Sequence, residues 1–390
     1  MLPEITDCYG LRPTAIFDRK RSKITLQMET KMCSANFKFI GIFFIAATGC
    51  DQAGAQSATQ IYGLINLGIS SQQLSGQSRV TAVTNGDMTT SFFGIRGSED
   101  LGGGLKSVFT MESFFRADTG EIGRGNSDVV FQRQAWVGLE KEGIGTFRIG
   151  RVASPNWLTT IRFGPFGGAS ITPYILQTYL PSALEPMITG SSTSDASWAN
   201  SIGYSSTNWA GFSTMLVYSL SEGSANGRRL GGSFNYASGA LAASLSFEKL
   251  SQMSLQFGAP APALVTAARP SYVATDDNTA QLALTYDFTA LKVFGQLSRT
   301  RLQNTTPTEI TLGTWQLGVS APLAAGKLMA SWAHTLMQRT ASADLERGTL
   351  SLGYDYSLSK RSDIYIAYIS DKVTNLSRGN GFTAGLRHSF

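Results

Sequence analysis

The feature of this sequence that most constrains its fold is a recurring run of about ten residues in which apolar side chains alternate with small or polar ones. From 350 to 356, leucine and tyrosine alternate with serine, glycine and aspartate, and similar patterns occupy 282–287 and 382–390. Neighbouring side chains of a β-strand point to opposite faces, so each run would carry one apolar and one polar face. A soluble sandwich also contains such strands, but many of them in succession are typical of a transmembrane β-barrel.

The connections between these runs alternate in length. The short ones are 98–104, 141–144, 206–209, 237–239, 289–290, 322–325 and 359–361. The long ones are about 74–87, 117–128, 153–197, 222–229, 251–276, 303–311, 340–346 and 373–379. Barrels in outer membranes have short periplasmic turns and longer external loops, and a closed barrel satisfies every backbone group in lipid. We therefore predict an all-β fold, a sixteen-stranded antiparallel transmembrane barrel with both ends on the short-turn side.

Composition argues against other classes of protein. Charged residues make up only 15% of the chain, whereas soluble domains carry about 25%. No apolar run reaches the roughly 20 residues that a membrane helix needs. Cys8, Cys33 and Cys50 all lie near the start, so the main body holds no disulfide framework, zinc finger or catalytic thiol. The basic residues are scattered, which gives no reason to expect a nucleic-acid partner. We predict no cofactor and no metal site.

Residues 1–55 are predicted to be an N-terminal extension plus a signal peptide that is removed. Lys38 precedes an apolar stretch, 39–47, that is too short to span a bilayer, and 53–55 offer a small-x-small cleavage pattern. The region before this stretch is longer than an export signal needs. Our hypothesis is that translation begins at Met28 or Met32.

The mature protein is expected to begin at Gln56, so that 56–390 form the barrel. N-terminal sequencing of the protein extracted from outer membranes checks this. The alternative is a lipoprotein cleavage box at 47–50, although alanine is atypical at its first position. An acylated Cys50 in the mature protein would contradict the Gln56 start.

The third long connection, 153–197, is too long for a plain loop in a compact fold. It also contains many large apolar residues, which argue against disorder. They are Trp157, Phe163, Phe166, Tyr174, Ile175, Leu176 and Tyr179. We expect this segment to pack inside the fold.

Several motifs resemble the trimeric general porins of Neisseria- and Burkholderia-type bacteria. The most specific are the turn Glu-Asp-Leu-Gly-Gly-Gly-Leu at 99–105 and the C-terminal Arg-His-Ser-Phe at 387–390. Further matches occur at 61–65, 94–98, 131–135, 145–151, 200–204 and 358–361. The resemblance therefore extends over the whole predicted mature chain.

The resemblance implies an outer-membrane channel for passive diffusion, built as a homotrimer, with 153–197 folded into the lumen as a constriction. It also implies that the barrel-assembly machinery reads the C-terminal Phe390. The other implied partners are outer-membrane lipids, lipopolysaccharide, and small hydrophilic solutes and ions.

Four arginines are candidates for the pore lining. Arg96 and Arg133 fall at basic wall positions of the family, and Arg148 should point inward because it alternates with apolar neighbours. Arg151 lies at a strand end. Charged groups that line a constriction set ion preference through the local potential. Each arginine has an alternative role, which is to brace strand pairs or loop ends.

The arginine row is thinner than in the relatives that the chain resembles. Phe92 and Gly203 stand where those proteins often have further arginines, and the third loop offers only Glu185 and Asp195 as opposing acids. We therefore expect a weak preference for anions.

The sequence offers little support for an enzyme. An enzyme needs a nucleophile with a base within hydrogen-bonding reach, but only His334 and His388 are available. His388 belongs to the C-terminal motif and His334 is interpreted as a polar barrel residue, so we predict no catalytic residue.

The alternative to a channel is an adhesin or receptor barrel that binds through its outer loops. Cell binding that survives pore blockage would identify such a receptor, whereas conductance would identify a channel.

Overall fold

The computed structural model describes residues 14–18, 23–27, 58–126, 128–178, 196–221, 227–257, 272–304, 309–340 and 342–390. The chain divides into two compact units, 1–53 and 54–390. In the first unit, β1 (Thr14–Asp18) pairs antiparallel with β2 (Lys23–Gln27). No strand was predicted there, because this region has no apolar alternation.

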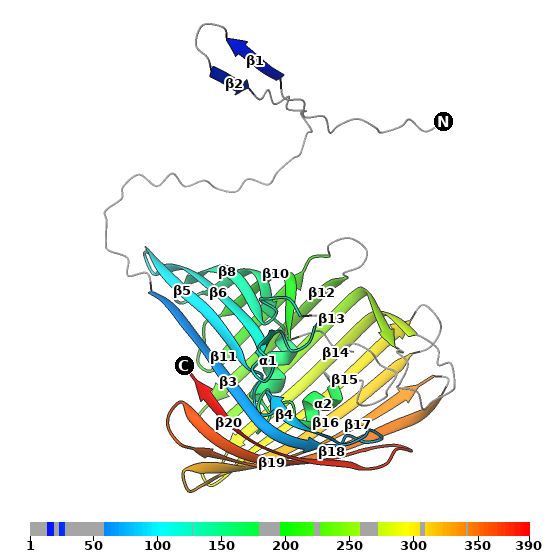
Figure 1. Ribbon diagram of the computed structural model, residues 1–390. Coiled ribbons are helices and arrows are strands. Elements are labelled where there is room, and N and C mark those ends of the chain that lie inside the picture. Colours follow the sequence, from blue (N-terminus) through cyan, green and yellow to red (C-terminus); the bar gives the residue numbers. More distant parts are fainter. Residues whose placement is uncertain are drawn as a thin grey trace, which may run out of the picture. The chain divides into compact units, whose positions relative to one another are not determined.

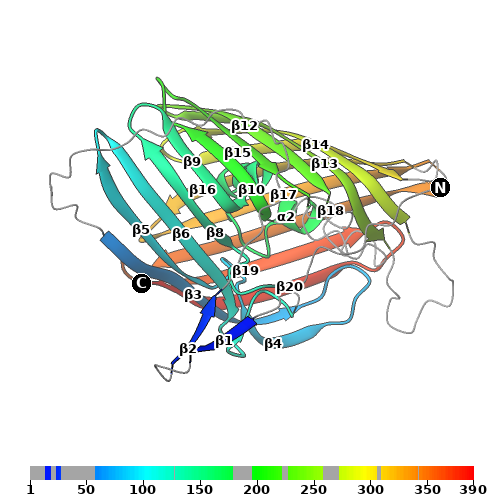
Figure 2. The same ribbon diagram turned by 90° about the horizontal axis from the view of Figure 1, so that it is seen from above.

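The second unit is a closed antiparallel barrel with sixteen wall strands among the described residues (Figures 1 and 2). These strands are β3 (Ala58–Gln72), β5 (Phe92–Gly102), β6 (Leu105–Arg116), β8 (Gln134–Lys141), β9 (Gly145–Ala153), β10 (Ser197–Ser206), β11 (Phe212–Ser219), β12 (Arg228–Ser238), β13 (Leu241–Phe257), β14 (Tyr272–Asp287), β15 (Lys292–Asn304), β16 (Ile310–Leu323), β17 (Gly326–Arg339), β18 (Ser342–Ser357), β19 (Ser362–Val373) and β20 (Gly379–Ser389). β20 pairs with β3 and closes the ring. The predicted fold class is confirmed.

Two of the long connections contain a short extra strand. β4 (Val80–Asn85) pairs with the end of β3, and β7 (Glu121–Ile122) pairs with the end of β6. The predicted short turns fall between wall strands as expected. In one of them, Gly102, Gly103 and Gly104 all have positive φ angles, of 85°, 59° and 73°. Glycine adopts this region without strain, so the backbone of the turn accounts for the glycine run.

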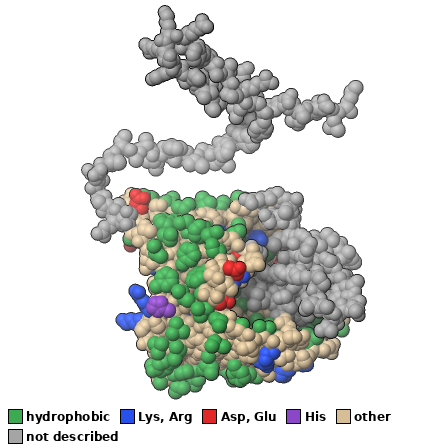
Figure 3. Space-filling model, in the orientation of Figure 1, with side chains coloured by type: hydrophobic (Ala, Val, Ile, Leu, Met, Phe, Trp, Pro, Cys, Tyr) green, Lys and Arg blue, Asp and Glu red, His purple; other side chains and the backbone are tan. Residues whose placement is uncertain are grey.

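The two faces of each strand differ in polarity as a membrane barrel requires. On β16, Leu317 and Val319 point outward and are 58% and 43% exposed, whereas the alternating Thr314 and Gln316 are buried. Apolar side chains therefore face lipid and polar ones face the interior. Figure 3 shows hydrophobic side chains spread over the visible wall of the barrel, with few charged groups among them.

The third long connection begins with two short helices, α1 (Pro155–Arg162) and α2 (Pro173–Thr178). Ser154 caps α1, since its hydroxyl accepts a hydrogen bond from the Trp157 amide, and Pro155 stands at the start of the helix, where no amide donor is needed. No helix in the described part of the chain is long and apolar enough to cross a membrane.

Both helices lie within the ring of strands (Figures 1 and 2). α1 packs against β12 and β13, and α2 packs against β16, β17 and β18. Their contacts are made with the polar inner faces of these strands, which explains why polar wall residues such as Gln281 and Thr335 are buried. Residues 179–195 lie outside the described part of the chain, so the narrowing of the lumen by 153–197 stays a prediction.

Candidate functional site

Three of the four candidate arginines lie on the inner wall formed by β3 to β9. Arg96 is on β5, Arg133 lies directly before β8, and Arg148 is on β9. Each guanidinium lies over an aromatic ring of the same wall. The distances from Cζ to the ring centre are 4.7 Å for Arg96 over Tyr62, 4.1 Å for Arg133 over Phe92 and 4.8 Å for Arg148 over Trp136. Such cation–π contacts hold a planar cation flat against the wall.

Arg96 and Arg148 line one recess of about 360 Å³ in this wall. Arg96 is exposed and donates to Gln60 Oε1 at 3.1 and 2.8 Å from its Nε and Nη2. Arg148 donates to Ser205 Oγ at 3.0 Å. Both partners are neutral, so hydrogen bonding orients these two guanidiniums without cancelling their charge. Glu140 lines the same recess and partly offsets the field.

The charge of Arg133 is balanced by an acid that the sequence analysis missed. Glu112 on β6 is buried and accepts from Arg133 Nη1 at 2.8 Å. Gln134 donates to the same oxygen, Oε2, at 3.0 Å, and the other oxygen, Oε1, accepts from the Tyr62 hydroxyl at 2.5 Å. Glu112 and the buried Thr110 are two residues apart on β6 and face the interior together. This alternation in the sequence could have identified Glu112 as an inward-facing acid. Phe92 provides the ring beneath Arg133.

The other predicted site residues are not brought together with these three. Arg151 is two residues from the exposed Ile149 on β9, so both side chains lie on the outward face of this strand. Its Nη1 donates to the Ser197 carbonyl at 3.2 Å. That contact ties the end of β9 to the start of β10, as the bracing alternative expects. Glu185 and Asp195 lie outside the described residues.

Further cations lie inside the barrel. Within the described segment 154–178 of the third connection, Arg162 in the last turn of α1 is the only charged side chain, and it is exposed. Lys292, Lys327 and Arg387 line a second recess of about 380 Å³ beneath Gly164–Gly168.

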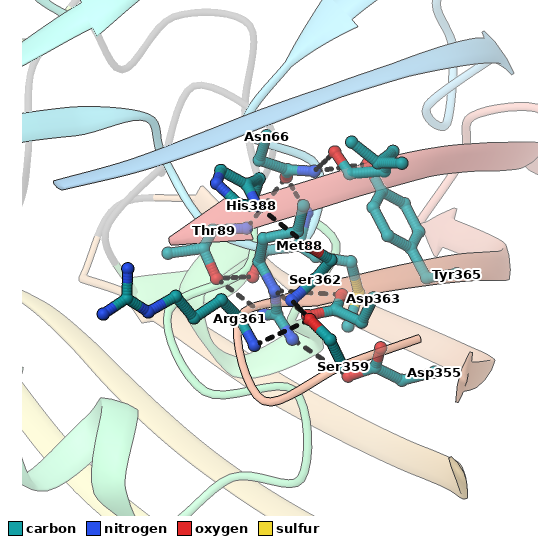
Figure 4. A network of polar contacts seen from close by, with 12 residues as sticks. Asn66, Met88, Thr89, Asp355, Ser359, Arg361, Ser362, Asp363, Tyr365 and His388 are labelled. Carbon is teal, nitrogen blue, oxygen red and sulfur yellow. Dashed lines mark hydrogen bonds and ion pairs between the residues drawn. The ribbon is translucent and has the colours of Figure 1, made fainter. Parts of the chain in front are cut away.

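Arg387 in this recess is held by two carboxylates. It bonds to Asp355 Oδ2 and Asp363 Oδ2, both at 3.0 Å, and to Thr89 Oγ1 at 3.0 Å. Figure 4 labels these three partners. The sequence pattern had placed Arg387 on the polar face of the last strand but had not identified these acids as its partners.

A buried ion pair fixes the described end of the third connection. Arg347 on β18 and Asp371 on β19 are both fully buried. Arg347 Nε and Nη2 donate to the two oxygens of Asp371 at 2.7 and 3.1 Å, while its Nη1 donates to the Leu176 carbonyl in α2 at 2.9 Å. Thr349 and the Ser75 amide also donate to Asp371, at 2.8 and 3.0 Å.

One further anchor is ionic, since the Asn156 amide of α1 donates to the buried Glu248 carboxylate at 2.9 Å. Four others join neutral side chains. Thr159 bonds to Ser244 at 3.1 Å, and Gln281 donates to Thr160 at 3.0 Å. Gln177 in α2 donates to Thr349 at 2.9 Å and accepts from Thr335 at 2.7 Å. Because every partner is buried, these bonds fix the helices against the wall with little competition from water.

A closed barrel of antiparallel strands, with lipid-facing apolar residues outside and charged residues inside, defines a transmembrane channel protein of the outer-membrane type. A family model described as "Gram-negative porin" matches residues 42–376, and the chain belongs to this family.

Individual relatives and solved structures agree with this family. The chain is 28% identical to outer membrane porin protein 32 of Delftia acidovorans, over 90% of this chain and 99% of the relative. It is 29% identical to the major outer membrane protein P.IB of Neisseria gonorrhoeae over 188 residues, which cover 47% of this chain and 49% of the relative. The solved anion-selective porin from Comamonas acidovorans superimposes with a TM-score of 0.69 at 24% identity, covering 86% of this chain and all of that one. The resemblance to Neisseria-type porins is thereby confirmed, and the protein is a porin channel of the Gram-negative outer membrane.

Proposed function

We propose that this porin is a homotrimer of water-filled channels that conduct small hydrophilic solutes by passive diffusion with a weak preference for anions. The observation that carries the proposal is Arg96, an exposed cation on the inner wall whose hydrogen-bond partner is a neutral amide oxygen. The preference is weak because Glu112 balances Arg133 and Glu140 lies near Arg148. The related solved porin is described as anion-selective, which supports the same preference for anions over cations.

The segment 153–197 is proposed as the constriction of each channel. Its described helices cover the inner faces of β12 to β18, which leaves the conducting path beside the arginine wall of β3 to β9. In this arrangement Glu185 and Asp195 supply the opposing negative charge. Arg162, on the same segment, reduces the separation of charge across the path.

Lipopolysaccharide, outer-membrane lipids and the barrel-assembly machinery are the further partners in this proposal, and catalysis has no part in it. Ser362 Oγ and His388 Nδ1 are 2.9 Å apart and form the one serine–histidine pair that the described residues bring into hydrogen-bonding contact. A nucleophile site also needs a group that orients the base and donors for an oxyanion. This exposed pair is on the outward face, and the acid next to it, Asp363, is engaged with Arg387 on the inward face. The pair instead joins β19 to β20 beside the chain end.

Replacing Arg96 and Arg133 together by glutamine is expected to move the zero-current potential of the purified trimer in a salt gradient toward the cation side, by a few millivolts. Planar-bilayer recordings measure this shift. It should shrink as salt rises, because the screening length falls from about 10 Å at 0.1 M to about 3 Å at 1 M.

Two matched variants sharpen this test. Glu112→Gln should move the potential the opposite way, since it leaves Arg133 uncompensated, and Arg151→Gln should leave it unchanged. An unaltered potential in the Arg96/Arg133 double variant would show that these arginines brace the wall and do not select ions. Absence of any conductance in the parental trimer would favour the receptor alternative.

A further inference from the structure

The outer wall of the barrel carries a depression of about 670 Å³ across β17, β18 and β19. It is separate from the channel lining described above. Its walls include the following side chains: Trp332 and His334 of β17, Glu346 and Leu350 of β18, Lys372 of β19, and Arg378 from the connection before β20. Three of these can carry a positive charge.

The direction of this depression follows from the alternation of the strands. Thr335 donates from its hydroxyl to Gln177 inside the barrel, and Ala333 and Thr335 are both fully buried, so the intervening His334 points outward. Asp371 bonds inward to Arg347, so the next residue, Lys372, points outward as well.

The depression lies where the apolar belt of the wall ends. Strand register places Ala330, Leu352 and Tyr368 in one outward row. The next row toward the long loops contains Trp332, Leu350 and Ser370, and the row after that contains His334, Gly348 and Lys372. The surface therefore changes from aliphatic and aromatic to polar and cationic within two rows. In outer-membrane barrels this boundary, on the long-loop side, lies at the level of the headgroups of the outer leaflet.

The cations of the depression are available to a ligand. Lys372 donates to the Leu376 carbonyl and Arg378 donates to Ser370 Oγ at 3.1 Å. Neither forms an ion pair with a carboxylate in the described part of the chain. The acid of the depression, Glu346, lies 3.6 Å from His334 Nε2 and is itself 65% exposed. Gly348 leaves the floor without a side chain, so the indole Nε1 of Trp332 borders the open space.

Resting on the lipopolysaccharide partner of the proposed function, we propose that this depression binds a phosphate group of lipopolysaccharide, with Lys372 and Arg378 on the phosphate and an acyl chain over Trp332 and Leu350. Arginine and lysine are the usual phosphate ligands of proteins, and basic pockets between membrane segments bind lipid headgroups. Lipopolysaccharide fits better than a phospholipid because the depression opens toward the outer leaflet, where the phosphorylated lipid A headgroup lies. Its several acyl chains also match the broad apolar rows below.

Native mass spectrometry of the purified trimer tests this proposal. The probe is bisphosphorylated lipid A, titrated into detergent-solubilised trimer, with phosphatidylglycerol and inorganic phosphate as separate arms. The site variant replaces Lys372 and Arg378 by glutamine. The matched control replaces Lys360 and Arg361 by glutamine, since these two cations occupy the short turn at the opposite end of β18 and β19.

The site variant should need about tenfold more lipid A for half-occupancy, given the contribution expected of each cation near an anionic headgroup, whereas the control should bind as the parent does. Both variants should keep the parental trimer band and conductance, which shows that each is folded. Equal lipid A binding by the site variant would overturn the proposal. So would equally tight phosphatidylglycerol binding, or displacement of lipid A by inorganic phosphate at matched concentration. Dissociation of the site variant into monomers would show that this face is an interface between copies of the chain.

Discussion

Replacing Arg347 by alanine is expected to release the end of α2 from the wall, raise the single-channel conductance and lower the thermal stability of the protein. The substitution removes the donor to the Leu176 carbonyl and leaves Asp371 as a buried charge without its partner. Breaking a buried ion pair on one side costs about 3–5 kcal/mol of unfolding free energy. Planar-bilayer recordings and the melting temperature of the trimer measure the two effects separately.

Two further variants control this experiment. Lys327→Ala removes an inward cation that is half exposed and 3.9 Å from Asp355, so it should change both quantities little. Arg347→Lys keeps the charge but loses the two-pronged geometry, and it should give intermediate values. Lower stability with unchanged conductance in Arg347→Ala would mean that the contact with Leu176 does not hold the channel's width.

Deleting Phe390 is expected to prevent most of the protein from reaching the outer membrane as a trimer, while synthesis and export continue. The Phe390 amide donates to the Gly63 carbonyl at 3.1 Å, and its carbonyl accepts from the Gly63 amide at 3.2 Å. The ring lies over Gly63 so closely that an added Cβ there would be 2.5 Å from its Cζ atom. Without this residue the closing pair of β3 and β20 loses its last bonds and leaves an open edge.

The comparison for this deletion is Phe382→Ala, which removes an outward aromatic side chain from the same strand but leaves the closing pair intact. Heat-resistant trimer in isolated outer membranes, detected on gels, is the measurement. Normal trimer levels after deletion of Phe390 would contradict a role in closure and assembly. A loss of equal size in Phe382→Ala would show that any outward ring on this strand matters as much.

The alternation of side chains predicted the barrel because lipid imposes one apolar face on every strand. The predicted turn 359–361, for example, falls between β18 and β19. The strand ends on the long-loop side were predicted less well. β13 and β14 extend to Phe257 and Tyr272, into a segment that was predicted to be a loop. Beyond the apolar belt the backbone ladder can continue without any alternation of polarity, so the sequence pattern disappears before the strand does.

The candidate site was predicted in part. Arg96, Arg133 and Arg148 were identified from motifs and strand phase, and all three lie on one wall. The acid that balances Arg133 was missed because Glu112 meets it only through the pairing of β6 with β8, 21 residues along the chain. The Arg347 pair depends likewise on the register of β18 and β19. The sequence of a single strand shows which of its residues face inward, but it does not show which residues of the neighbouring strand lie opposite them.

The bonds that hold α1 and α2 join buried groups, and this burial has a consequence for a cell whose surroundings change in salinity. Hydrogen bonds among buried serine, threonine and glutamine side chains, such as Thr159 with Ser244, are insensitive to dissolved ions. The anion preference that we propose for Arg96, in contrast, should weaken as the surrounding salt becomes more concentrated. In brackish or concentrated media the porin would therefore admit solutes by the same size limit as in fresh water, while losing most of its discrimination by charge.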